Sequence, residues 1–360
     1  MKYVDEFRDE VLIAKEAAHI RAAVNRKWRF MEVCGTHTMS IFRFALRQIL
    51  PGDIELVSGP GCPVCVTPNG YLDKAIAIAG MKNVIIATFG DMLRVPGSHS
   101  TLEIQKADGR DIRTVYSTTD ALEIAEKYPT KEVVFLGVGF ETTVPTVAKS
   151  IIIAKKAGLK NYSVLSAHKT MPEALGSLAG SGLNVDGFIL PGHVSAITGT
   201  SPYRFLAKIY KKRCVVSGFE PLDILQSISI LIKQSPAKVE IQYKRIAAPG
   251  GNPKARVCIY KVFEKCDSVW RGIGRVADSG LKIKKAYADL DAEVKFHPRV
   301  RPPKEDKRCR CGDVLRGLIA PTECMLFGKA CTSQHPIGAC MVSSEGTCAA
   351  YYKYRGNING

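Results

Sequence analysis

The sequence has no long apolar run. No stretch of this 360-residue chain approaches the roughly 18 consecutive apolar residues that a membrane-spanning helix requires. The N-terminal segment, MKYVDEFRDEVLIAKEAAHIRAAV, also lacks the apolar core of a secretion signal, because acidic and basic side chains are mixed through it. Its apolar residues have the spacing of an amphipathic helix. We therefore expect a cytoplasmic protein without a membrane segment.

Three common catalytic motifs are missing as well. The chain has no Walker A pattern and no GxGxxG fingerprint, which are the glycine-rich loops that hold phosphate groups. It also has no GxSxG turn, which would expose a nucleophilic serine. These absences argue against a nucleotide-dependent enzyme and against a hydrolase.

Acidic residues are few, with 34 Asp and Glu against 51 Lys and Arg, and the formal net charge is +17. The basic residues are spread along the chain, and the densest run is only Lys211–Arg213. Zinc-finger, helix-turn-helix and RNP patterns are absent too, so we expect no nucleic-acid partner. The charge predicts a basic solvated surface, with an acidic protein or an anionic ligand as the alternative.

Cysteine, by contrast, is abundant. The chain has 12 cysteines, and six of them fall within the last part of the sequence: Cys309, Cys311, Cys324, Cys331, Cys340 and Cys348. A disulfide-stabilised scaffold would be short and secreted, and this chain is neither. Thiolates on a loop-rich segment suit a 4Fe–4S cluster. Structural zinc is the rival interpretation, although only Cys309 and Cys311 are closely spaced; unliganded structural thiols are a third.

Between residues 29 and 220 the chain repeats one pattern, in which a short apolar run ends in a Gly- or Pro-rich turn before a helical segment. The runs are FMEVCG, IELVSGPG, VIIATFGD, VVFLGVGF, YSVLSAH, GFILPGH and CVVSGFEP. This alternation predicts an α/β fold with two similar parallel-sheet lobes facing a cleft, followed by a Cys-rich domain of loops and helices. We expect the borders at 1–115, 116–240 and 241–360.

Two N-terminal motifs carry further thiols at predicted strand ends. Cys62 and Cys65 form a CPVC motif, which is typical of a redox-active pair but is also half of a zinc site. Cys34 lies in CGTHT with His37 three residues later, in a polar turn where a soft thiolate would suit iron.

Further polar residues follow other predicted strands, and each alone fits a structural role. They are Asp91 and Arg94, Glu141, His168 and Lys169, and His193. Because ligands of parallel sheets bind beyond the carboxyl ends of the strands, we expect several of these turns to share a cleft.

Taken together, several segments resemble the HypD family of hydrogenase maturation proteins. They are CGTHT, GPGCPVCVTP, TFGDMLRVPGS, GFETT, PGHVS, WRGIG, CRCGDVLRG and the tail CMLFGKACTSQHPIGACMVSSEGTCAAYYKY. They run from residue 34 to residue 354, which is almost the whole chain. The resemblance implies two similar α/β domains and a third domain with a 4Fe–4S cluster.

The resemblance also implies a function, namely assembly of the Fe(CN)2CO group of nickel–iron hydrogenases. Such proteins form a scaffold with HypC, and HypE, supplied by HypF, delivers cyanide to the iron held there. The implied role is a metallocentre-assembly scaffold with redox activity rather than a conventional turnover enzyme. We expect the chain alone to be a monomer.

Carried over residue by residue, the resemblance implies four cluster ligands: Cys309, Cys324, Cys331 and Cys348. Cys34 would bind the transient iron that carries cyanide and carbon monoxide, together with a cysteine of HypC. Cys62 and Cys65 would be a redox pair that receives electrons from the cluster. His37 and Glu345 fall in motifs that the family treats as functional.

Two rival functions stay open. One is a cluster-linked thiol–disulfide oxidoreductase, which would leave Cys34 with little to do. The other is a zinc-stabilised interaction protein without redox function.

Overall fold

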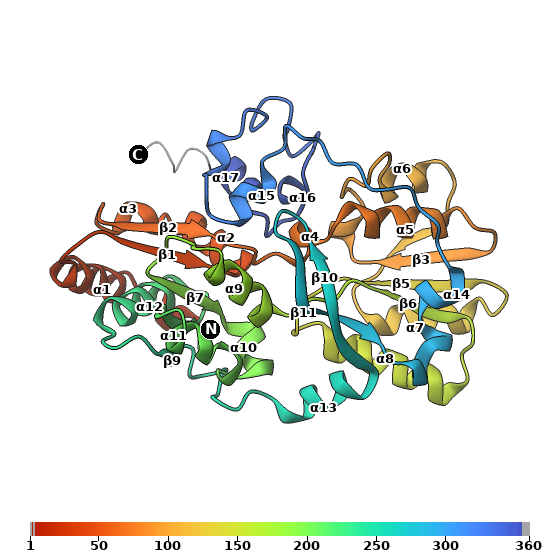
Figure 1. Ribbon diagram of the computed structural model, residues 1–360, viewed down its shortest axis with the longest axis horizontal. Coiled ribbons are helices and arrows are strands. Elements are labelled where there is room, and N and C mark those ends of the chain that lie inside the picture. Colours follow the sequence, from red (N-terminus) through yellow and green to blue (C-terminus); the bar gives the residue numbers. More distant parts are fainter. Residues whose placement is uncertain (1, 3, 355–360) are drawn as a thin grey trace.

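Two separate parallel sheets form the framework of the protein, which we describe from a computed structural model covering residue 2 and residues 4–354 (Figure 1). The predicted α/β class with two parallel-sheet lobes and a Cys-rich C-terminal region is confirmed. All seven apolar runs form strands. Strands such as β3 (Val84–Thr88) and β7 (Gly187–Pro191) are buried along their whole length, as expected where helices cover both faces of a sheet.

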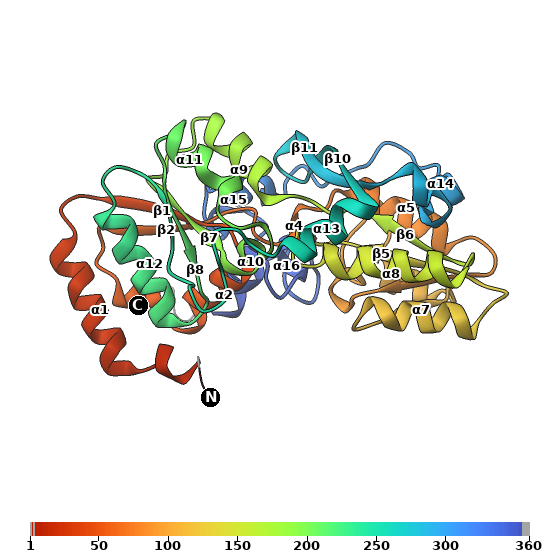
Figure 2. The same cartoon turned by 90° about the horizontal axis from the view of Figure 1, so that it is seen from below.

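The first sheet has the strand order β2-β1-β7-β8-β9, and every neighbouring pair is parallel. Its strands are β1 (Trp28–Glu32), β2 (Ile54–Ser58), β7, β8 (Arg213–Ser217) and β9 (Val239–Ile241). Helices α1 (Glu10–Ala23), α2 (Gly35–Arg43) and α12 (Pro221–Lys233) lie on one side, and α9 (Met171–Gly180) and α11 (Arg204–Lys208) on the other (Figure 2).

The second sheet has the order β4-β3-β5-β6 and is also parallel. Its strands are β3, β4 (Ile112–Thr114), β5 (Glu132–Gly137) and β6 (Tyr162–Ser166). Its helices include α5 (Asn69–Ala79), α6 (Leu102–Ala107), α7 (Thr118–Lys127) and α8 (Val144–Ala157). A capping box between Ser117 and Asp120 fixes the start of α7.

The strand order corrects the division at residues 115 and 240. The chain leaves the first sheet after β2, builds the whole second sheet, and returns to the first sheet with β7. A border at residue 115 therefore separates β3 and β4 from their own sheet, and residue 240 lies inside β9. Apolar periodicity identifies strands, but it does not reveal which strands are neighbours, so it could not place these borders.

The only antiparallel pair in the described part of the chain is a hairpin of β10 (Phe263–Trp270) and β11 (Gly274–Ile283). It stands between the two sheets in Figure 1 and packs on α9. Helix α13 (Pro253–Val262) precedes it and packs on α8, while α14 (Ala292–Phe296) follows it beside β6.

The Cys-rich region crosses over the junction of the two lobes (Figure 1). It contains α15 (Cys311–Leu315), α16 (Ala339–Val342) and α17 (Thr347–Lys353). Helix α16 packs on α4 (Pro63–Val66), and α17 packs on α2. The remaining short helices are α3 (Leu46–Ile49) and α10 (Gly192–Thr198). None of the helices in residues 2 and 4–354 combines the length and apolar character needed to cross a bilayer.

Candidate functional site

Cys34 sits where β1 ends and α2 begins, as the N-cap of that helix. The Thr36 and His37 amides at the helix start lower the pKa of its thiol and so favour the thiolate. The loop that holds the CPVC motif lies directly against it, because the Gly35 amide donates to the Gly61 carbonyl at 3.1 Å. A Cβ on Gly61 would lie 2.2 Å from the Cys34 nitrogen, so only glycine permits this approach.

Glu345 reaches the same point from the loop between α16 and α17. Thr36 Oγ1 donates to Glu345 Oε1 at 2.6 Å, and a Cβ on Gly35 would lie 2.5 Å from Glu345 Cβ. Burial, and then the nearby Glu345 carboxylate, raise the pKa of Cys34 to about 12. The thiol is therefore neutral near pH 7 until a cation displaces its proton.

His37 is fully buried one turn into α2. Its Nε2–H donates to the Gly218 carbonyl at 2.9 Å, and its ring stacks on Phe219 with centroids 4.7 Å apart. Burial lowers the pKa of His37 to about 4, so the ring is neutral at pH 7. The Nδ1 atom has no hydrogen-bond partner within the described residues and keeps a free lone pair.

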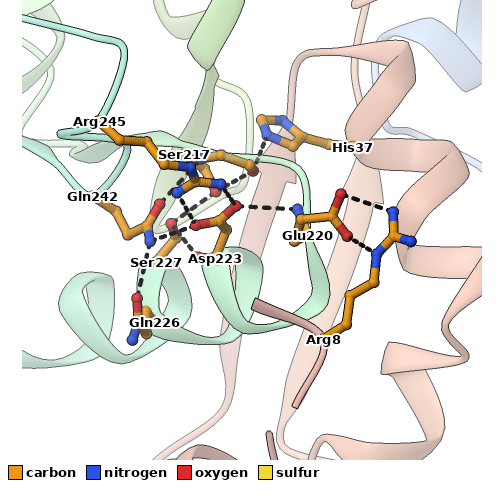
Figure 3. Close-up of polar contacts among 10 residues, drawn as sticks. Arg8, His37, Ser217, Glu220, Asp223, Gln226, Ser227, Gln242 and Arg245 are labelled. Carbon is orange, nitrogen blue, oxygen red and sulfur yellow. Dashed lines mark hydrogen bonds and ion pairs between the residues drawn. The ribbon is translucent and has the colours of Figure 1, made fainter. Parts of the chain in front are cut away.

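A polar network fixes the Gly218 peptide, whose carbonyl accepts the hydrogen bond from His37 (Figure 3). The Gly218 amide donates to Gln242 Oε1 at 3.1 Å, and Gln242 Nε2 donates to Asp223 Oδ1 at 2.8 Å. Asp223 is completely buried, and Arg245 donates to both of its carboxylate oxygens. The orientation of His37 thus depends on residues in and after α12 that sequence reasoning missed, because no motif marks them.

The CPVC motif forms the short helix α4. Cys62 is its N-cap, Pro63 occupies the first turn, and the Cys65 amide donates to Cys62 Sγ at 3.2 Å. Both thiols are buried, and burial raises the pKa of Cys65 well above its ordinary value. The pair therefore lies in a dry environment, close to Cys34 through Gly61.

Two cysteines without a predicted role connect this pair to the C-terminal region. Cys340 interacts with the Cys65 thiol on one side, lowering its pKa, and its sulfur lies 2.8 Å from Cys311 Sγ on the other. Both thiols are free and buried. A line of sulfur atoms thus runs from Cys65 to the C-terminal cysteines. The close spacing of Cys309 and Cys311 was the one sequence signal that could have indicated it.

The C-terminal cysteines line one pocket of apolar character, walled by Leu326, Phe327 and Met341. They are Cys309, Cys311, Cys324, Cys331, Cys340 and Cys348. This lining offers thiols as donors and no carboxylate or imidazole, which is the donor set of an iron–sulfur cluster. Within the described residues, no three His, Cys, Asp or Glu side chains converge as around a single metal ion. In a cubane each thiolate binds its own iron, so the four predicted ligands fit the group.

Comparisons with known proteins agree with this set of motifs. A family model described as "HypD: Hydrogenase formation hypA family" matches residues 11–355. The chain is 45% identical over 367 residues to the hydrogenase maturation factor HypD of Escherichia coli (strain K12), covering 99% of this chain and 98% of the relative. The HypD of Rhodobacter capsulatus is 46% identical over 372 residues, covering 99% of each chain. That of Cupriavidus necator is 44% identical over 368 residues, covering 98% and 97%.

The chain belongs to the HypD family. The family match spans both sheets, the hairpin and the Cys-rich region.

Asp91 of the TFGDMLRVPGS segment and His193 of PGHVS lie near the site through neighbouring residues. Ser343 and Ser344, which precede Glu345, donate to Asp91 Oδ2 at 3.2 and 3.3 Å. The His193 ring lies 4.1 Å from that of Phe219, on which His37 also stacks.

The other polar strand-end residues serve the second sheet and the hairpin. Glu141 accepts a hydrogen bond from the Met171 amide, and Lys169 donates to Ser268 and Val269 in β10. His168 packs edge-on against Phe263. The contacts of Glu141, His168 and Lys169 are therefore those of packing between elements, and the structure shows no contact between them and Cys34.

Proposed function

We propose that this HypD-family chain is the scaffold on which the Fe(CN)2CO group of nickel–iron hydrogenases is assembled. Cys34 holds the substrate iron together with a cysteine of HypC, and HypE delivers cyanide to it. One observation carries the proposal: Cys34, Glu345 and the CPVC loop converge on the N-terminus of α2 from three distant parts of the sequence.

Binding of iron requires the Cys34 proton to leave. A thiolate is a soft ligand that suits iron carrying cyanide and carbon monoxide. The helix amides of Thr36 and His37 stabilise the thiolate once it forms, and the Glu345 carboxylate is the charged group beside it that can receive the proton. Neutral His37, with Nδ1 free, adds a lone pair near the same helix start without adding charge.

Cys309, Cys324, Cys331 and Cys348 would hold the 4Fe–4S cluster, which supplies electrons when bound. The chain contributes the buried Cys340 and Cys311, which link that pocket to Cys65. The Cys62–Cys65 pair can take up two electrons and two protons in passing from disulfide to dithiol. This arrangement supports a redox role for the pair beside the iron held by Cys34.

Iron analysis of anaerobically purified protein tests the proposal. We expect about four irons for one cubane cluster, and one further iron when the chain is purified with HypC. Cys34→Ala should lose only that further iron. Cys258→Ala, whose thiol instead faces the Pro145 carbonyl, is the matched control and should lose none. Retention of the further iron by the Cys34 variant would contradict the proposal.

The line of sulfur atoms also favours a second candidate, a cluster-linked thiol–disulfide oxidoreductase. Such a protein would reduce a disulfide substrate without HypC or HypE. Replacing Cys62 and Cys65 by Ala should abolish hydrogenase maturation and leave the cluster spectrum intact under the scaffold proposal. Full maturation by this variant, with loss of disulfide reduction alone, would favour the oxidoreductase.

A further inference from the structure

Arg271, in the WRGIG motif, is a buried cation that the proposed function leaves unexplained. It lies in the turn between β10 and β11 and is only 6% exposed. Its amide donates to the Val66 carbonyl and its Nε to the Thr67 carbonyl, each at 2.8 Å, so it is tied to the end of the CPVC helix.

The β10–β11 turn packs directly against the backbone of the segment that carries Cys309 and Cys311. Gly272 has φ +77°, and a Cβ there would lie 2.3 Å from the Gly312 Cα. Gly312 follows Cys311 at the start of α15. The contact of the two glycines holds Arg271 beside the segment that carries Cys309 and Cys311.

Within residues 2 and 4–354, the charge of Arg271 has no counter-ion. Its Nη2 is buried without a hydrogen-bond partner, and no carboxylate of the described residues forms an ion pair with it. Its neighbours differ, because Arg310 and Arg316 both pair with Asp313, at 2.7 and 2.5 Å. A buried cation without an anion is costly, so a negative partner is expected when the site is complete.

The geometry points to the C-terminal thiolates as that partner. Arg271, Cys309 and Cys311 line one pocket of about 230 Å³. A guanidinium in the same pocket stabilises a thiolate there more than it stabilises a neutral thiol.

We propose that Arg271 is a tuning residue, whose fixed charge stabilises the thiolate-held cluster and raises its reduction potential. The inference rests on the proposed function, since it assumes that Cys309 is a cluster ligand. One added electron makes the bound cluster more negative by one charge. A cation held in a buried site therefore favours the reduced form more than the oxidised form.

A redox titration of the full, cluster-loaded chain, followed by electron paramagnetic resonance, tests this role. For Arg271→Gln we expect the ratio of reduced to oxidised cluster at a fixed potential to fall by about tenfold, which is about 59 mV for one electron. Arg271→Lys should keep most of the wild-type potential. Arg316→Gln, which removes a paired cation from the same pocket, should leave the potential unchanged.

An unchanged potential in Arg271→Gln with intact cluster content would overturn the inference. A second readout is retention of the cluster. Arg271→Gln should lose its iron to a chelator faster than Arg316→Gln does, because the buried charge that stabilises the thiolate-held cluster is gone. Equal rates of iron loss would overturn the inference. A wild-type chain that never binds a cluster would contradict the proposed function instead.

Discussion

Cys34 combines two opposing influences within a few residues. The helix amides favour its thiolate, whereas burial and the Glu345 carboxylate disfavour it more strongly, so that its pKa is raised to about 12. A thiol in this state resists oxidation and alkylation while the site is empty of iron, and it ionises when a metal arrives. Cys34 is therefore a protected thiol rather than a permanently reactive nucleophile, which is what the proposed role as an iron ligand requires.

Glu345→Gln tests this balance. The variant keeps an oxygen that can accept the hydrogen bond from Thr36 but removes the negative charge, so the pKa of Cys34 should fall. We expect faster iodoacetamide labelling of Cys34 in the metal-free chain at pH 8, by roughly tenfold for each pKa unit. Glu323→Gln, at a different turn of the same region, is the control and should change nothing. A slower reaction in Glu345→Gln would contradict the account.

Glu141 predicts a pH dependence of stability. Burial raises its pKa from an ordinary value of about 4.5 to about 8. Between these values the folded chain holds a proton that the unfolded chain has lost, so the free energy of unfolding should decrease as pH rises from 4.5 to 8. Glu141→Gln should remove part of that decrease, which urea unfolding at pH 5 and pH 8 would measure.

In the same experiment Glu123→Gln, an exposed change on α7, serves as the control. If Glu141→Gln and wild type lose the same stability between the two pH values, Glu141 is ionised in the folded chain and the argument fails.

At the scale of elements, the sequence indicated the strands well and their neighbours poorly. Each of the seven apolar runs became a strand, because Val- and Ile-rich segments between Gly and Pro turns have few other ways to be buried. The short strands β4 and β9 were missed, since three residues carry no periodicity. Strand order depends on contacts between distant segments, which one sequence does not display.

The GPGC loop and α2 provide an element-scale prediction. Gly61→Ala would place a methyl group 2.2 Å from the Cys34 nitrogen, so the loop must move away from Cys34. We expect a loss of about 1–3 kcal/mol in stability, as for other overpacked sites, together with loss of the iron held with HypC. Gly52→Ala, where a Cβ meets nothing within 4 Å, should keep both in thermal unfolding and iron analysis. Equal behaviour of the two variants would show that the close approach is unimportant.

At the scale of the whole molecule, the C-terminal region joins the two lobes, because it contacts both of them. It brings Glu345 to Thr36 at the end of the first sheet and Ser343 to Asp91 after a strand of the second. Arg94 also donates to the Ser333 carbonyl, 239 residues away in sequence. The individual cysteines could be chosen from sequence by their motifs. The approach of Glu345 to Cys34 and of Cys340 to Cys65 could not, because it depends on this long-range docking.

If the C-terminal region holds the proposed iron–sulfur cluster, removal of the iron should weaken its contacts with the two lobes. The apolar cluster that the C-terminal region forms on its own, around Leu326, Cys331 and Met341, is small, although Leu315 and Ala339 join the main core. A bound iron–sulfur cluster would therefore supply much of its folding energy. After chelation of the iron, we expect faster hydrogen exchange in α16 and α17, and in the start of α2 beneath them. Helix α8 in the second sheet is the internal control. Unchanged exchange in α16 and α17 would mean that the region is held by its protein contacts alone.

Infrared spectroscopy of the anaerobic complex with HypC and HypE tests the central claim most directly. The account predicts cyanide and carbonyl stretching bands for the wild-type chain and for Cys258→Ala, and their loss in Cys34→Ala. Bands of full intensity in the Cys34 variant would show that the iron is held elsewhere and would contradict the account.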